Sequence, residues 1–210
     1  SNQAYVQVLS ITGGENSFFA DKGWLFGLLL AGAVAAVIIG GIRSIGNVAS
    51  KIVPFMAILY VFSAVIIIAM SAEHLMGAIG LIVSSAFEAN SMTGGAIGAM
   101  IVGFQRAVFS NEAGIGSASI AHSAVKTDEP VTEGLVSLLE PFIYSMLICT
   151  LTSLVIVTTA YPNGLMDGGL EGIALTSAAF AHHISWSPYV MSVAALLFAF
   201  STSIAWAYYG

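Results

Sequence analysis

Apolar runs separated by short polar or glycine-containing segments recur along the whole chain. We interpret residues 1–12 as the end of one span and residues 43–47 as a polar loop, with Pro54 in the first turns of the span that follows, where its missing amide costs little. Further runs are long enough to cross roughly 30 Å of hydrocarbon as helices. They comprise residues 24–42, 49–70 and 135–159 and the segment that begins at Ser187. The pattern predicts an all-α polytopic membrane protein.

Two further segments contain apolar residues but are too short or too polar to cross a bilayer. Residues 71–93 have Glu73, His74, Glu88 and Asn90 near their ends, and residues 170–184 follow a turn at Tyr161-Pro162-Asn163-Gly164. We expect a short helix in each, lying on the membrane surface. The most charged loop is expected at residues 126–133.

Residues 94–125 are long enough for a span, but residues 110–116 interrupt the run with the sequence Ser-Asn-Glu-Ala-Gly-Ile-Gly. A continuous helix in lipid must satisfy its backbone groups internally, and glycine weakens it. We therefore predict two half-helices with an open joint. The ending half leaves carbonyls free and the starting half leaves amides free, which suits a cation and a carboxylate. A small zwitterion and a coupling cation are the hypothesis for this joint.

Composition supports a membrane protein, because 58% of the residues are hydrophobic and only 8% are charged. The single cysteine, Cys149, lies in an apolar run and is interpreted as a buried small hydrophobe, so no disulfide within the chain is expected. The net charge of −6 and the lack of a basic cluster argue against nucleic-acid binding. Residues 1–210 are expected to form one incomplete transmembrane domain from the interior of a longer chain.

The few basic residues predict an orientation. Arg43, Lys51 and Lys126 are expected on one side of the membrane and Lys22 on the other. By the positive-inside rule the first side is cytoplasmic, which places the protein in the cell (inner) membrane as a multi-pass protein.

Ionisable residues at membrane depth are costly and are functional candidates. Arg106 precedes the joint and Glu112 lies within it, so they are predicted either to contact solute or to form a structural or gating ion pair. Glu140 precedes Pro141 near the start of its span, and it is predicted to reach the interface or, alternatively, to act as a proton site.

Neutral candidates lie at the joint and in the final span. Phe109 can close a site over a solute, and Ser110 and Asn111 offer hydrogen-bonding groups where the backbone is open. Ser201 and Thr202 supply hydroxyls that, with carbonyls, can form an oxygen cage for sodium. The alternative is that these hydroxyls donate to carbonyls one turn earlier in the same helix.

The histidines do not support a metalloenzyme. His122 is predicted on the inner side and His182 and His183 on the outer side, with no carboxylate at ligand spacing to either. The sequence Gly114–Ser119 lacks the GxSxG context of a serine hydrolase. No enzymatic step and no cofactor are expected, with Na⁺ serving only as the coupling ion.

Residues 108–122, VFSNEAGIGSASIAH, resemble the sixth-span motif of the alanine or glycine:cation symporters, the sodium:alanine symporter family. The likeness extends through residues 49–56, 126–128, 198–202 and 206–210. It implies a partial inverted-repeat, leucine-transporter-like fold, from the end of the third helix through the eighth. It also implies that Phe109, Ser110 and Asn111 line the amino-acid site. Trp206 would lie below that site, and Ser201 and Thr202 would bind sodium.

The chain differs from the family pattern at a few positions. Ser119 stands where proline is usual, Gln105 and Ala107 replace small residues or glycine, and no aspartate lies near Tyr144, although Glu140 precedes it. These differences bear on substrate preference and proton coupling.

The resemblance implies a sodium-coupled symporter that imports small neutral amino acids, alanine or glycine, by alternating access in the lipid bilayer. The alternatives are a proton-coupled transporter or exchanger of the same fold, and a membrane structural or sensory subunit that does not transport. The resemblance implies that the first helix, which would supply the other half of both sites, is expected to precede residue 1.

Overall fold

A computed structural model describes residues 2–87, 100–101, 103–105, 108, 116–166, 168–170 and 172–209. The chain divides into two compact units, which are described separately. The first unit comprises Ser1–Met70 and Val155–Gly210, and the second comprises Ser71–Leu154. All regular elements in the described residues are helical, which confirms the predicted all-α class.

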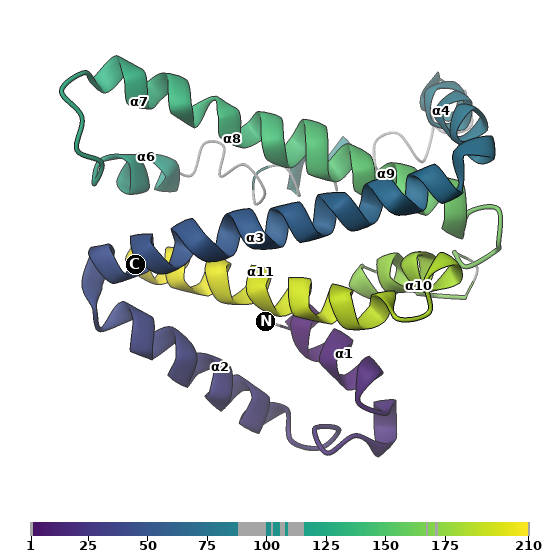
Figure 1. Ribbon diagram of the computed structural model, residues 1–210, viewed down its shortest axis with the longest axis horizontal. Coiled ribbons are helices and arrows are strands. Elements are labelled where there is room, and N and C mark those ends of the chain that lie inside the picture. The colour runs from purple at the N-terminus through teal and green to yellow at the C-terminus, as the bar shows by residue number, and fades with distance from the viewer. Residues whose placement is uncertain are drawn as a thin grey trace. The chain divides into compact units, whose positions relative to one another are not determined.

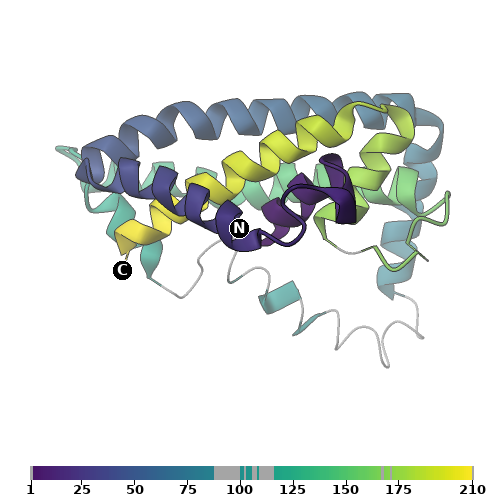
Figure 2. The same ribbon diagram turned by 90° about the horizontal axis from the view of Figure 1, so that it is seen from below.

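The first unit is built around two long helices, α3 (Gly41–Met70) and α11 (Ser187–Tyr209), which pack side by side (Figures 1 and 2). The remaining elements are α1 (Asn2–Ile11), the 3₁₀ turn η1 (Gly14–Asn16), α2 (Gly23–Ile38), η4 (Ile156–Ala160) and α10 (Ile173–His183). Helix α11 also contacts α1, α2 and α10, so it is the central helix of this unit.

The core of the first unit follows from helical spacing. Met56, Tyr60, Ala64 and Ile67 lie at intervals of three to four residues along α3 and are all buried. The buried residues of α11 are mostly small or flexible, namely Ser187, Met191, Ser192, Ala194, Ala195, Ser201 and Ile204. Small residues allow two helices to approach closely, which is the usual packing mode in lipid.

A buried glutamine joins three helices of this unit. The side-chain amide of Gln7 on α1 donates to Ser177 Oγ of α10 at 2.7 Å and to the carbonyl of Pro188 at the start of α11 at 3.4 Å. Ser192 Oγ donates to the Pro188 carbonyl at 2.8 Å and also lies 3.5 Å from the Gln7 carbonyl. Because Gln7 is almost completely buried, these bonds replace the water that its amide would otherwise bind.

The second unit contains α4 (Ala72–Phe87), α6 (Ser117–His122), α7 (Pro130–Ser137), α8 (Leu139–Pro141), the π-helix η3 (Phe142–Cys149) and most of α9 (Thr150–Val155). Helix α7 continues through α8, η3, α9 and η4 as one run, Pro130–Ala160, with two π-helical stretches. The first stretch starts directly after Pro141, whose ring cannot fit a regular α-helical turn and which has no amide to donate.

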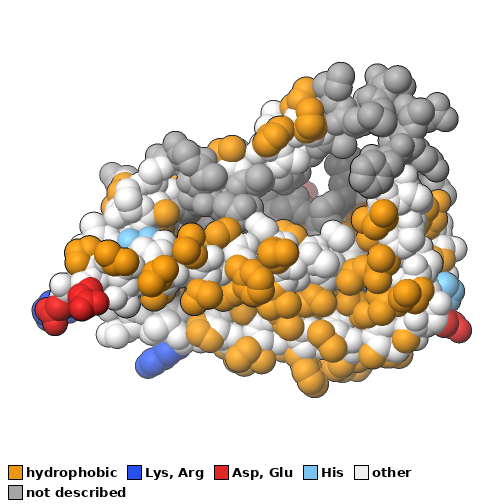
Figure 3. Space-filling model, turned by 90° about the horizontal axis from the view of Figure 1, so that it is seen from above, with side chains coloured by type: hydrophobic (Ala, Val, Ile, Leu, Met, Phe, Trp, Pro, Cys, Tyr) orange, Lys and Arg blue, Asp and Glu red, His pale blue; other side chains and the backbone are white. Residues whose placement is uncertain are grey.

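Among the described residues, three helices are long and apolar enough to cross a membrane: Gly41–Met70, Pro130–Ala160 and Ser187–Tyr209. Large hydrophobic side chains remain exposed on them. On the middle helix, Leu135, Leu138, Phe142 and Met146 are all more than half exposed and lie along one face. Figure 3 shows hydrophobic side chains over much of the face drawn. Such surfaces fit contact with lipid, which agrees with the predicted membrane class.

Three predictions about the early spans are wrong. The loop expected at residues 43–47 is helical, because the chain turns earlier, where Gly41 has a φ of 68° that only glycine adopts without strain. Helix α2 therefore ends at Ile38 and is shorter than the predicted span, and Pro54 lies inside α3 rather than in its first turns. The turn at residues 161–164 and the helix start at Ser187 are confirmed.

Candidate functional site

The predicted helix joint is described only at its C-terminal edge. Gly116 has a φ of 86°, in the left-handed region, and α6 starts at Ser117, so no α-helix continues backwards through Gly116. This agrees with a half-helix that begins after the FSNEAGIG sequence. The four predicted residues of the joint and the arginine before it lie outside the described residues: Arg106, Phe109, Ser110, Asn111 and Glu112.

Ser201 is buried on the face of α11 that packs against α3. Its hydroxyl donates to the Phe198 carbonyl at 3.1 Å and lies 3.8 Å from the sulfur of Met56. Ser203 donates in the same way to the Ala199 carbonyl at 2.7 Å. The expected alternative, bonding to the preceding turn, therefore applies to both serines. Their hydroxyl oxygens still keep lone pairs that can accept a bond or bind a cation.

Thr202 lies on a different face of α11, because successive residues in a helix are about 100° apart. It is exposed and lines a cavity of about 350 Å³ together with Gln3 and Ala4 of α1 and Ala199 of α11. Its hydroxyl has no hydrogen-bond partner among the described residues. Ser201 thus faces α3, whereas Thr202 faces α1, and the described residues do not bring the two hydroxyls to one point.

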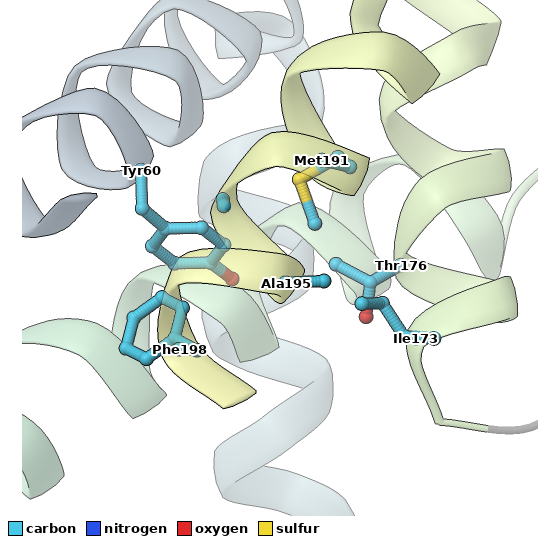
Figure 4. A pocket seen from close by; sticks show the side chains of 7 residues that line it. Tyr60, Ile173, Thr176, Met191, Ala195 and Phe198 are labelled. Atoms are coloured by element: carbon cyan, nitrogen blue, oxygen red, sulfur yellow. The ribbon is translucent and has the colours of Figure 1, made fainter. Parts of the chain in front are cut away.

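A second cavity, of about 210 Å³, adjoins the first and is shown in Figure 4. The two share Ile173, Ala195 and Phe198 in their linings. Tyr60 of α3 meets Phe198 edge to face, with ring centroids 6.4 Å apart, and Thr176 of α10 lies on the opposite side. The lining is mainly apolar, so this cavity suits an apolar group better than an ion. Sequence reasoning missed Tyr60, because an aromatic residue in an apolar span gives no distinguishing signal.

Trp206 lies one turn after Thr202 on α11, is 40% exposed, and meets the Tyr209 ring edge to face at 5.9 Å. Glu140 lies in α8 directly before Pro141 and is half-buried. The positions of Trp206 and Glu140 on their helices are thus known. Their contacts do not test the roles predicted for them.

The basic residues used to predict orientation fall at helix ends. Lys22 precedes α2 and stacks over the Phe18 ring, 3.7 Å from its centroid. Arg43 lies in the first turn of α3, just beyond the other end of α2, and Lys51 lies about two turns further along α3. The 16-residue length of α2 separates Lys22 from Arg43 along that helix.

His122 has a carboxylate partner that the sequence analysis missed. Its Nδ1 lies 2.5 Å from Glu133 Oε1, which pairs the last residue of α6 with the first turn of α7. His182 and His183 contact each other on α10, with ring centroids 5.2 Å apart. Within the described ranges no group of three or more His, Cys, Asp or Glu residues is arranged to hold a metal ion. The sequence feature that could have predicted the contact between His122 and Glu133 is that a helix end and the next helix start are separated by only a short connection.

Comparison with known proteins decides the family. The Sodium:alanine symporter family matches residues 2–210. The chain belongs to the sodium:alanine symporter family. It is 41% identical over 209 residues to the sodium/alanine symporter AgcS of Methanococcus maripaludis, covering 98% of this chain and 46% of that protein.

Two further relatives of this chain are bacterial proteins. The amino-acid carrier protein AlsT of Bacillus subtilis is 36% identical over 208 residues, covering 98% of this chain and 43% of AlsT. The sodium/proton-dependent alanine carrier protein of Bacillus sp. PS3 is 29% identical over 216 residues, covering 97% of this chain and 48% of that protein. The chain thus spans about half the length of these relatives, which are transporters rather than enzymes.

Proposed function

We propose that the protein containing this chain is a sodium-coupled symporter that imports small neutral amino acids by alternating access. The observation that carries the proposal is the family match over residues 2–210, which includes the FSNEAGIG sequence at the predicted joint. The proposed arrangement is a partial leucine-transporter-like inverted repeat, in a cell membrane with Arg43, Lys51 and Lys126 on the cytoplasmic side.

In this proposal the amino acid binds at the joint, and sodium binds near α11. Phe109, Ser110 and Asn111 contact the amino acid, with Trp206 below it. Arg106 and Glu112 form a gating or structural ion pair beside them. Each ligand must bind one conformation more tightly than the other, because equal affinities would shift no equilibrium.

Ser201 and Thr202 are proposed as sodium ligands. The support from the described residues is strongest for Thr202, whose hydroxyl lines a cavity of about 350 Å³ and has no partner in the described part of the chain. Ser201 supplies lone pairs while its hydrogen is donated to Phe198. Hydroxyl and carbonyl oxygens are the ligands that hard cations prefer.

The test is uptake of labelled alanine and glycine into proteoliposomes by the full-length protein, with and without an inward sodium gradient. Thr202→Ala is expected to raise the half-saturating sodium concentration about ten-fold, equivalent to one lost interaction of about 1.4 kcal/mol. Ser203→Ala is the matched control, because the Ser203 hydroxyl belongs to the same helix and donates to Ala199. Equal uptake without sodium would refute sodium coupling.

A proton-coupled transporter is the second candidate, with Glu140 as the proton site. One observation favours it, namely the relative named a sodium/proton-dependent alanine carrier protein. Uptake that continues without sodium, falls as external pH rises, and is lost in Glu140→Gln would support it. Uptake that needs sodium and is unchanged in Glu140→Gln would exclude it.

A further inference from the structure

Helix α6 is too short to be stable in one orientation without contacts to other elements. It contains 6 residues, Ser117–His122, and it starts after a glycine with left-handed backbone geometry. Isolated helices of fewer than about 12 residues are marginal, so tertiary contacts must hold α6 in place. Figure 1 shows α6 joined to α7 by the loop of residues 123–129 within the second unit.

The contact that joins the two helices is the hydrogen bond between His122 and Glu133. A carboxylate accepts hydrogen bonds, so the Nδ1–H of His122 donates to Glu133 Oε1, at 2.5 Å. The side chains are 28% and 19% exposed, so the bond is partly shielded from water. Hydrogen bonds to charged groups are stronger than neutral ones, and shielding from solvent strengthens them further.

Among the described residues, the serine hydroxyls near Glu133 do not donate a hydrogen bond to its carboxylate in place of His122. His122 and Glu133 line a cavity of about 550 Å³ with three serines, Ser119, Ser123 and Ser137. Each serine hydroxyl donates to the carbonyl three residues before it, at 2.6, 2.7 and 2.7 Å. Each hydroxyl hydrogen is therefore already bonded within its own helical turn. The serine oxygens can only accept hydrogen bonds from groups in the cavity.

The turn between the helices has its own local bonds. Thr127 Oγ1 donates to the Glu129 carbonyl at 3.1 Å and accepts from the Glu129 amide at 3.2 Å. Lys126 and Asp128 in this turn are exposed. The turn is therefore internally ordered, but in the described contacts it is the His122 and Glu133 side chains that join the end of α6 to α7.

We propose that His122 and Glu133 form a latch that positions α6 against the start of α7, so that the two helices move together during the transport cycle. The two residues are positioning residues: they fix the helix that follows the predicted joint rather than contact the transported solute. The effect on transport rests on the proposed function, whereas the effect on helix order does not.

The first test is uptake by the full-length protein carrying His122→Ala, Glu133→Ala, or the exchange His122→Glu with Glu133→His. Each single variant is expected to lower the maximal uptake rate about ten-fold, since it removes a charge-assisted bond. The exchange, which restores a pair of the same chemistry, is expected to return the rate to within about three-fold of the original. A positioning role predicts a change in maximal rate with little change in the KM for the amino acid.

The matched control is a second pair of histidine and glutamate. His74 lies 3.7 Å from Glu73, and these side chains are 52% and 82% exposed, so this contact is screened by water. His74→Ala is expected to leave uptake unchanged. An exchange variant as slow as the two single variants, with normal helix order, would overturn the latch.

The second test is hydrogen–deuterium exchange of peptides covering residues 117–137 in the same purified proteins. The single variants are expected to exchange faster than the original protein in α6, and the exchange variant is expected to restore protection. Unchanged exchange in both single variants overturns the proposal. A protein without sodium-driven uptake would refute the proposed function, while this measurement would still decide whether the latch exists.

Discussion

The first unit buries large apolar side chains such as Phe180 and Ile67, whereas Ala78 is the sole buried hydrophobic residue among the described residues of the second unit. Polar contacts differ in the same way. Gln7 is almost fully buried and bonds to two other helices, whereas the His122 and Glu133 side chains are 28% and 19% exposed. Within its own residues the first unit has a packed core, and the second has apolar surfaces and one shielded polar pair.

The two units therefore differ in which side chains contribute to their stability. In lipid an exposed leucine costs little, because hydrocarbon chains are as apolar as the side chain. The helices of the second unit can therefore present Leu135, Leu138 and Phe142 outwards without penalty. Truncating such a residue should matter little, whereas truncating a packed residue of the first unit leaves a cavity. Substitutions in the two units should separate these effects.

The largest expected effect is Phe180→Ala in α10. Phe180 is 1% exposed and lies 6.0 Å, centroid to centroid, from the Tyr60 ring. Removing a buried phenylalanine typically costs about 3–5 kcal/mol. Phe142→Ala is the control from the second unit, because Phe142 is 57% exposed, and it should cost less than about 1 kcal/mol. The measurement is thermal unfolding of the full-length protein in detergent, and equal losses would contradict the comparison.

The next effect in size is Gln7→Ala. This change removes the amide that bonds to Ser177 and Pro188 and leaves a cavity between α1, α10 and α11. A loss of about 2 kcal/mol in unfolding free energy is expected, with faster hydrogen exchange in α10. Gln3→Ala is the control, because Gln3 is exposed and accepts a single bond, from the Ile173 amide at 3.2 Å. If the Gln7→Ala protein is as stable as the Gln3→Ala protein, the bonds of the Gln7 side chain do not hold these helices together.

Much of this arrangement was predictable from the sequence, because long apolar runs in a chain with few charges allow few alternatives to spanning helices. The error at residues 43–47 shows where such reasoning fails. Arg43 and Asn47 are polar because they lie near a helix end, and polarity alone does not distinguish an exposed helical turn from a loop. The backbone of Gly41, which ends the preceding turn, decides the boundary.

The candidate site was predictable in part. The hydroxyls of α11 stand out in an apolar helix, but their directions depend on which neighbours α11 packs against, and a single helix does not specify those neighbours. Ser201 faces Met56 of α3, whereas Thr202 faces Gln3 and Ala4 of α1. The pair of His122 with Glu133 was missed for the same reason, since its residues come from two helices whose packing is set by the turn between them.

A smaller effect is expected from Tyr5→Phe, which tests a polar contact at the edge of the first unit. Tyr5 Oη donates to the carbonyls of Phe19 at 2.7 Å and Ala20 at 3.1 Å, and so holds the segment before α2 against α1. Losing one hydroxyl while keeping the ring should cost about 1 kcal/mol. Tyr189→Phe is the control, because Tyr189 is 60% exposed and its hydroxyl is available to solvent. The measurement is again thermal unfolding, and indistinguishable melting temperatures for the two variants would contradict the role of Tyr5.

The smallest expected effect has the opposite sign. Thr159, in the second π-helical stretch, is completely buried, and its hydroxyl has no hydrogen-bond partner in the described part of the chain. An unsatisfied buried hydroxyl is destabilising, and valine has nearly the same shape without it.

Thr159→Val should therefore raise the unfolding free energy by about 0.5–1 kcal/mol. Thr158→Val is the matched control, because the neighbouring Thr158 hydroxyl donates to the Val155 carbonyl at 3.4 Å, and it should give no gain. Unfolding of both variants, measured in parallel, checks the difference between them. A loss of stability in Thr159→Val would mean that the hydroxyl has a partner in the folded protein. The packed first unit would then hold a polar contact beyond those made by Gln7.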